Sequence, residues 1–206
     1  QESAGIATSD GRTVTVYKDL GLVAQVFDEA KIAGLDGHLG IGHTRYSTTG
    51  STHWTNAQPI HRQVGTTSVA LAHNGNLTNT RQLAHELGSG VETSDSALMV
   101  EAIARRIDDE RSDERGLEKA MFEALPTFEG AFSLVVMDQG RVIGARDPHG
   151  FRPLCLGELP EGGWVLASET AALDLVGATF RRDVEPGEMV VIDATGVRSL
   201  RPFEST

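Results

Sequence analysis

The sequence has a single cysteine among its 206 residues, Cys155. One cysteine cannot form an internal disulfide, which fits a reducing, cytoplasmic environment. No apolar run approaches the roughly 20 residues that span a bilayer, and the chain does not open on a signal-peptide pattern. Positive charge is also scarce, since 18 Lys and Arg stand against 29 Asp and Glu, for a net charge of −11. Such a surface repels phosphate backbones and anionic lipids, so we expect no nucleic acid partner and no membrane partner.

Several chemical motifs are absent as well. The sequence contains no G-x-x-x-x-G-K-[ST] phosphate loop, no G-x-G-x-x-G fingerprint and no G-x-S-x-G nucleophile elbow. Its seven histidines never recur at the three- or four-residue spacing of a helix. With one cysteine besides, we expect no metal site. The acidic run at residues 108–110 is interpreted as a solvated charged face.

Hydrophobic periodicity predicts strand-rich ends around a helical middle. Expected helices cover residues 23–35, 78–87, 95–107, 117–125 and 169–176. Expected strands cover residues 3–9, 14–17, 39–46, 68–73, 131–137, 142–145, 153–157, 164–167, 189–192 and 197–200. This order favours the α+β class over alternating βαβ units. The chain has no linker and no internal repeat, so we expect one domain.

Two segments are predicted to be irregular. Residues 47–66 are rich in Gly, Pro, Asn, Thr and Ser and show little periodicity, which predicts one long loop. Loops of that length in compact domains are usually functional. Residues 74–76, Asn-Gly-Asn, follow a predicted strand and are typical of a turn.

Polar residues stand where three predicted elements begin or end, which is where sites are often built. The guanidinium of Arg45 matches a carboxylate, although for a lone arginine a surface ion pair is the commoner explanation. The Asn74 amide and the Gly75 N–H can form an oxyanion hole, or simply a turn. Asp95 opens a helix and can hold an ammonium group, or serve the helix terminus. Together the three describe a site for an amino acid whose side-chain carbonyl is attacked, as in glutamine hydrolysis.

Longer strings point to a family. They are GHTRYSTTG at 42–50, NAQP at 56–59, LAHNGNL at 71–77, RDPHGFRPL at 146–154, SET at 168–170, ALD at 172–174 and PGE at 186–188. On these strings the chain resembles the glutaminase domain of the amidophosphoribosyltransferase family, within the class II glutamine amidotransferases. The resemblance extends over nearly the whole chain. The strings at 46–48 and 147–153 favour this family over glucosamine-6-phosphate synthase and asparagine synthetase.

The resemblance implies an N-terminal-nucleophile hydrolase fold, a four-layer αββα sandwich, here lacking its first strand. It implies that Arg45 binds the α-carboxylate of glutamine, that Asp95 binds its α-ammonium group and that Thr48 lines the pocket. Asn74 and Gly75 would form the oxyanion hole. In the family, the ammonia released from glutamine passes to a phosphoribosyltransferase domain. There it converts phosphoribosyl pyrophosphate to 5-phosphoribosylamine, in the first step of de novo purine biosynthesis.

The sequence departs from the family pattern in several places. The family's nucleophile is a cysteine at the mature N-terminus, and this chain has no counterpart of it or of the transferase half. Cys155 lies in an apolar strand and is interpreted as a buried structural thiol. Ala97 stands where many relatives have an acidic residue. We therefore expect residues 1–206 to be a glutaminase domain truncated at both ends and inactive alone, from a homo-oligomeric cytoplasmic enzyme.

Cofactor expectations also follow from the resemblance. We expect none in this chain, and Mg²⁺ in the transferase domain. Some family members carry an iron–sulfur cluster, but one cysteine cannot supply its four thiolates, so a cluster would belong to the whole protein. Two alternatives stay open at this point. One is a non-catalytic glutamine-binding or regulatory module that has lost its nucleophile, and the other is a sister amidotransferase with a sugar-phosphate acceptor.

Overall fold

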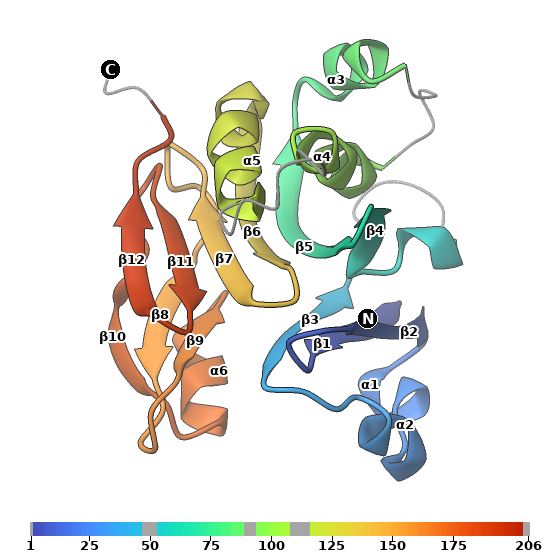
Figure 1. Cartoon of the computed structure of the whole chain (residues 1–206), viewed down its shortest axis with the longest axis vertical. Helices are drawn as coiled ribbons and strands as arrows, with labels where there is room; N and C mark the ends of the chain where they lie inside the picture. Colours follow the sequence, from blue (N-terminus) through green and yellow to red (C-terminus); the bar gives the residue numbers. More distant parts are fainter. Residues whose placement is uncertain (1, 47–52, 89–93, 108–115, 204–206) are drawn as a thin grey trace.

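The fold is described from a computed structural model of the chain, for residues 2–46, 53–88, 94–107 and 116–203 (Figure 1). Its strands pair in three antiparallel sheets. The largest has the order β12-β11-β7-β6-β5-β4. Its strands are β4 (Ile60–Val64), β5 (Thr67–Leu77), β6 (Gly130–Met137), β7 (Arg141–Arg146), β11 (Met189–Asp193) and β12 (Gly196–Leu200). The expected α+β class is confirmed at this level.

Two smaller sheets have three strands each. The first has the order β2-β1-β3, with β1 (Ser3–Ser9), β2 (Val14–Leu20) and β3 (Leu39–Arg45). The second has the order β10-β8-β9, with β8 (Cys155–Glu158), β9 (Trp164–Ala167) and β10 (Thr179–Asp183). Both lie on the side of the large sheet away from its helices (Figure 1).

The helices are short and separate into groups. They are α1 (Val23–Val26), α2 (Glu29–Ala33), α3 (Thr80–Glu86), α4 (Asp95–Ala104), α5 (Gly116–Ala124) and α6 (Thr170–Leu175), with 3₁₀ turns η1 (Trp54–Asn56) and η2 (Leu125–Thr127). Helices α3, α4 and α5 lie over one face of the large sheet (Figure 1). The α4 residues Met99 and Ile103 are buried in the main core. No helix of the described ranges is long and apolar enough to cross a bilayer.

Strand β5 is buried on both faces. Val69 and Leu71 belong to the core under the helices, whereas Ala70 and Ala72 pack with Ile41 of the β1–β3 sheet. This alternation is the two-residue period of a strand, in which successive side chains point to opposite faces. Continuing it, residue 73 faces the helical layer and residue 74 faces the β1–β3 sheet. The strand therefore distributes neighbouring polar residues to two different layers.

The predictions of two irregular segments are partly wrong. Residues 60–64 form β4, which pairs with β5 from Ile60 opposite Leu71 to Val64 opposite Thr67. Only Ile60 of this edge strand is buried, so its sequence carries little periodicity. Residues 54–56 form a 3₁₀ turn, and residues 47–52 lie outside the described ranges. The predicted turn at 74–76 is also wrong, because β5 continues to Leu77 and pairs with β6 throughout.

Two further predictions need correction. The helix expected at 23–35 is two short helices, because Phe27 is extended and the Asp28 side chain caps the second helix by accepting from the Lys31 N–H. Strand β10 was not predicted, since most of its residues are exposed and no apolar alternation marks it. The other predicted helices and strands occur within a few residues of their expected ends.

The segment at 146–154 folds around a buried carboxylate, to which several backbone amides donate hydrogen bonds. Asp147 is fully buried, and its two oxygens accept from four backbone amides, those of Phe132, His149, Phe151 and Arg152. The guanidinium of Arg146 donates to the carbonyls of Gly150, Arg152 and Val184. These bonds satisfy two charged groups and fix the connection between β7 and β8. Much of this string is thus structural.

A second buried carboxylate joins two sheets. Glu188 is 2% exposed and accepts from the Arg182 guanidinium at 2.7 and 2.8 Å, from Ser199 and from the Glu185 N–H. Arg182 lies on β10 and Ser199 on β12, so the carboxylate ties a small sheet to the large one. Burial alone would raise the pKa of Glu188, but the hydrogen bonds from Arg182 and Ser199 lower it to about 2.

The Glu188 contacts predict an acid-dependent stability. Because the pKa is lower in the folded chain than the ordinary value of 4.5, the carboxylate stabilises the fold above about pH 4.5 and loses this effect as the pH falls toward 2. We expect Glu188→Gln to lower the free energy of unfolding at pH 7 by roughly 2 to 3 kcal/mol. Urea denaturation of both proteins between pH 3 and pH 7 measures this.

Glu158 provides the matched control, because it ends β8 and pairs at the surface with Arg181, the neighbour of Arg182 on β10. Glu158→Gln should cost less than about 1 kcal/mol, as exposed pairs do. Equal losses for the two variants would contradict a special role for Glu188.

Candidate active site

A cleft of about 340 Å³ lies between the β1–β3 sheet and β5. Its apolar wall comes from β1 and from Val23 and Phe27 at α1, and its polar groups are His43, Thr44, Asn74 and Ser168. These groups come from β3, from β5 and from the residue directly after β9. Segments distant in the sequence therefore meet here.

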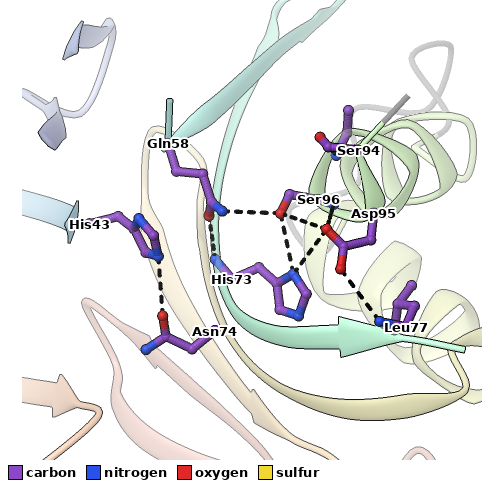
Figure 2. A network of polar contacts seen from close by, with 9 residues as sticks. His43, Gln58, His73, Asn74, Leu77, Ser94, Asp95 and Ser96 are labelled. Atoms are coloured by element: carbon purple, nitrogen blue, oxygen red, sulfur yellow. Dashed lines mark hydrogen bonds and ion pairs between the residues drawn. The ribbon is translucent and has the colours of Figure 1, made fainter. Parts of the chain in front are cut away.

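Asn74 is the predicted site residue that lines this cleft. Its Oδ1 lies 3.1 Å from His43 Nε2 (Figure 2). An amide oxygen can only accept, so His43 donates from Nε2, and the Asn74 N–H₂ group remains as a donor for a ligand. Burial lowers the pKa of His43, although the Asn74 bond opposes this, and the imidazole is therefore neutral at pH 7. The sequence contained His43 within a family string, but nothing in its pattern indicated this contact.

Gly75 occupies a position that only glycine fits. Its φ is 138°, within the left-handed region, and it pairs with Phe132 inside the ladder of β5 and β6. A Cβ at this position would overlap the carbonyl oxygen of Ala131. Asn74 and Gly75 thus lie in a distorted strand and not in a tight turn. Their joint role as an oxyanion hole stays a prediction.

Asp95 lies in the first turn of α4, directly after the N-cap residue Ser94. Its Oδ1 accepts from the Ser96 N–H at 2.8 Å, and its Oδ2 accepts from the Leu77 N–H at 3.4 Å (Figure 2). The carboxylate thus lies against the backbone of β5, two residues beyond Gly75. It is on the helical side of the strand, whereas the Asn74 side chain points to the other side (Figure 2).

The remaining predicted residues contribute less to the described site. Arg45 ends β3, and its NH1 lies 3.5 Å from Glu2 Oε2. Its side chain is 15% exposed, so the ion pair is largely shielded from water. Arg45 does not line the cleft, and Thr48 lies outside the described residues. The structure therefore places Asn74 and Gly75 within β5 and Asp95 against the end of that strand, with the Asn74 and Asp95 side chains on opposite sides of it. Arg45 lies at the end of the neighbouring sheet.

Sequence reasoning missed a buried polar network beside Asp95. Gln58 donates from Nε2 to Ser96 Oγ at 3.1 Å, and its Oε1 accepts from the His73 N–H at 2.6 Å. His73 Nδ1 lies 3.2 Å from Ser96 Oγ and 3.8 Å from Asp95 Oδ1. Burial lowers the pKa of His73 to about 4 despite the nearby Asp95 carboxylate, so the ring is neutral at pH 7. Gln58 fell in the predicted loop, where no periodicity marks a buried residue.

Cys155 has the properties of a structural thiol. It is buried in β8, its Sγ donates to the Ala167 carbonyl at 3.3 Å, and burial raises its pKa. A nucleophilic cysteine instead has a lowered pKa and access to its substrate. The thiol belongs to a separate apolar cluster and does not line the cleft. The sequence-based expectation that Cys155 is buried is confirmed.

The described residues contain no group of three or more His, Cys, Asp or Glu side chains placed to hold a metal ion.

Comparisons with known proteins agree with one another. The family described as a glutamine amidotransferase domain matches residues 43–175. The chain is 52% identical to an amidophosphoribosyltransferase of Mycobacterium leprae over 211 residues, which cover 98% of this chain and 37% of that protein.

Solved structures give the same result. One described as the allosteric regulatory enzyme of purine biosynthesis superposes with a TM-score of 0.88 at 39% identity, covering 100% of this chain and 44% of that one. The glutamine phosphoribosylpyrophosphate amidotransferase of Bacillus subtilis, complexed with ADP and GMP, gives 0.86 at 38% identity with the same coverage. The chain thus spans less than half the length of these relatives.

The Gly75 geometry predicts a local loss of stability on substitution. We expect Gly75→Ala to lower the free energy of unfolding by about 2 to 4 kcal/mol, because the left-handed φ is strained and the new methyl group overlaps the β6 backbone. Urea denaturation followed by circular dichroism measures the change. Gly40→Ala on β3 is the control, since its Cβ would meet nothing closer than 3.5 Å. A similar loss in both variants would contradict this explanation.

The environment of Cys155 predicts a protected thiol. We expect it to react with a disulfide reagent about 100-fold more slowly in the folded chain than in 6 M guanidinium, because burial excludes both the reagent and the thiolate form. Absorbance of the released thiolate follows the reaction. Reaction at the rate of the unfolded chain would show that the thiol is accessible.

Proposed function

The chain belongs to the glutamine amidotransferase domain family, and we propose that it forms the glutamine-hydrolysing domain of an amidophosphoribosyltransferase. The observation that carries this proposal is the 52% identity to the M. leprae enzyme across 98% of the chain. In the proposed reaction the domain releases ammonia from glutamine. The ammonia then converts phosphoribosyl pyrophosphate to 5-phosphoribosylamine, the first step of de novo purine biosynthesis, in a transferase domain outside residues 1–206.

The proposed fold is that of the N-terminal-nucleophile hydrolases, a four-layer αββα sandwich. Its support is the packing of the large sheet, which has α3, α4 and α5 on one face and the β1–β3 sheet on the other. Helices α1 and α2 lie beside that smaller sheet (Figure 1). This arrangement leaves the cleft with Asn74 between the two sheet layers.

Each polar group of glutamine has a proposed partner in the chain. Arg45 binds the α-carboxylate, which would replace its present ion pair with Glu2. Asp95 binds the α-ammonium group, and Thr48 lines the pocket. Asn74 donates from its amide to the oxygen of the attacked carbonyl, with Gly75 completing the oxyanion hole. The donor group that Asn74 presents beside the cleft supports this assignment.

The reaction needs a nucleophile that Cys155 cannot supply. In the proposed mechanism a cysteine thiolate attacks the amide carbon of glutamine, and the oxyanion hole stabilises the negative oxygen. The proton that the thiol lost passes to the amide nitrogen, the C–N bond breaks and ammonia leaves, and water then hydrolyses the thioester to glutamate and the free thiol. Because Cys155 is buried in β8, we propose that the attacking cysteine comes from outside residues 1–206.

Cofactors, assembly and location extend the proposal. We propose that Mg²⁺ acts in the transferase domain with phosphoribosyl pyrophosphate. The donor set of this chain does not fit an iron–sulfur cluster, because it has one cysteine where four thiolates are needed. Any such cluster would be held elsewhere in a homo-oligomeric enzyme. We propose a cytoplasmic location, which the single unpaired cysteine supports.

Two assays test the proposed function. The purified 206-residue chain should release no ammonia from glutamine, with or without Cys155→Ala, because it lacks an accessible thiol. The polypeptide that the gene encodes should hydrolyse glutamine, and Asn74→Ala in it should lower kcat by about 100- to 1,000-fold, the usual effect of one oxyanion donor. Coupled detection of ammonia measures both.

Asn76→Ala is the matched control, because Asn76 is an exposed asparagine two residues along the same strand. It should keep kcat within about threefold. Ammonia release by the 206-residue chain that Cys155→Ala abolishes would overturn the assignment of the nucleophile.

A further inference from the structure

We propose that Gln58, Ser96 and His73 form a buried hydrogen-bonded relay that holds the Asp95 carboxylate in position for the α-ammonium group of glutamine. This inference rests on the proposed function, in which Asp95 binds that group. The three residues do not touch the substrate in this proposal. They are positioning residues that act through Asp95.

Gln58 connects the segment before β4 to β5 and α4. Strand β4 pairs with β5 only as far as Leu71, so the His73 N–H lies beyond the end of that ladder. The Gln58 side-chain oxygen accepts from this N–H at 2.6 Å, in place of a backbone carbonyl. Because His73 N can only donate there, the Gln58 amide has one orientation, with its nitrogen directed at Ser96 Oγ (Figure 2).

The position of Gln58 is itself fixed from the opposite side. The preceding residue, Ala57, accepts at its carbonyl from Lys18 Nζ at 2.5 Å. The Trp54 indole donates to the Lys18 carbonyl at 3.2 Å, and the Lys18 ammonium lies over its ring. Strand β2 therefore anchors residues 54–57, and Gln58 enters the core from a fixed backbone.

Ser96 can satisfy all its neighbours in one arrangement. A hydroxyl has one proton to donate and two lone pairs that accept. Gln58 Nε2 takes one lone pair. If neutral His73 carries its proton on Nδ1, it donates this proton to the second lone pair of Ser96 Oγ. The hydroxyl proton of Ser96 is then directed to Asp95 Oδ1 at 3.4 Å. With the proton on Nε2 instead, His73 would accept the hydroxyl proton and Asp95 would lose this bond.

Asp95 then receives donors at both oxygens. Oδ1 accepts from the Ser96 N–H and hydroxyl, and Oδ2 accepts from the Leu77 N–H. An acidic residue in the first helical turn is free to turn toward other amide groups of that turn. The relay directs its carboxylate toward the β5 backbone instead, at Leu77, two residues beyond Gly75. All three relay side chains are at most 6% exposed, so water does not compete for these bonds.

Two substrates distinguish an effect of these residues on the position of Asp95 from an effect on the stability of the fold. Glutamine and 4-carbamoylbutanoate differ only in the α-ammonium group, and the ratio of their kcat/KM values measures the contribution of its partner. We expect Ser96→Ala and Gln58→Met, made in the polypeptide that the gene encodes, each to lower this ratio about 10-fold. The loss should appear in the KM for glutamine, with kcat within about threefold, because the ammonium contact is present before and during the reaction.

Two further variants complete the design. Asp95→Asn should lower the ratio at least as much, and adding Ser96→Ala to it should have no further effect on the ratio. Gln82→Met is the matched control, because Gln82 lies on the surface of α3 and its amide donates to Glu86 of the same helix. Ser96→Ala removes one oxygen from a helix that Ser94 caps, so it tests the relay even if Gln58→Met does not fold.

The outcomes are distinguishable. If the relay variants weaken both ligands equally, they act on the fold and the relay is overturned. If Asp95→Asn lowers the ratio but both relay variants keep it, Asp95 binds the ammonium group without them and the relay is again overturned. If Asp95→Asn keeps the ratio, its role in the proposed function is wrong, and the relay proposal falls with it.

Discussion

Strand β5 runs between a helical layer and a second sheet, with apolar side chains buried on each side. A polar residue placed on such a strand must find its hydrogen-bonding partners inside the protein, because leaving a polar group unpaired there costs on the order of 1 to 3 kcal/mol. His73 and Asn74 are two such residues in succession. Strand alternation sends them to opposite layers, and each layer supplies partners of its own. The rest of the candidate site follows from this constraint.

On the helical side, the demand for partners is met by side chains from two other segments. Gln58 substitutes for a missing strand where β4 stops pairing, and Ser96 joins it to the first turn of α4. On the other side, His43 of β3 occupies the Asn74 oxygen and leaves its amide protons for a ligand. One network orients an acid beside the strand, and the other prepares a donor at the cleft. The two sets belong to a single strand but perform separate tasks.

Two of the strings on which the family resemblance rests are mostly structural here. The carboxylate of Asp147 gathers four backbone amides, and Glu188 joins β10 to β12 through Arg182. Both residues are buried anions whose charge is compensated within the fold. They hold the β8–β10 sheet, which carries Cys155, against the large sheet. The identity shared with amidophosphoribosyltransferases therefore extends well beyond the residues proposed to bind glutamine.

The sequence by itself determined the α+β class, most helices and buried strands, the structural character of Cys155 and the family. Local apolar periodicity and long ordered strings suffice for these. It did not determine β4 or β10, whose exposed residues carry no period, nor the continuation of β5 through Asn74 and Gly75. That strand persists because Gly75 takes a left-handed φ and β6 pairs alongside it. Only the tertiary structure decided which neighbours His73 and Asn74 meet, because those partners lie far along the chain and come together only when the layers pack.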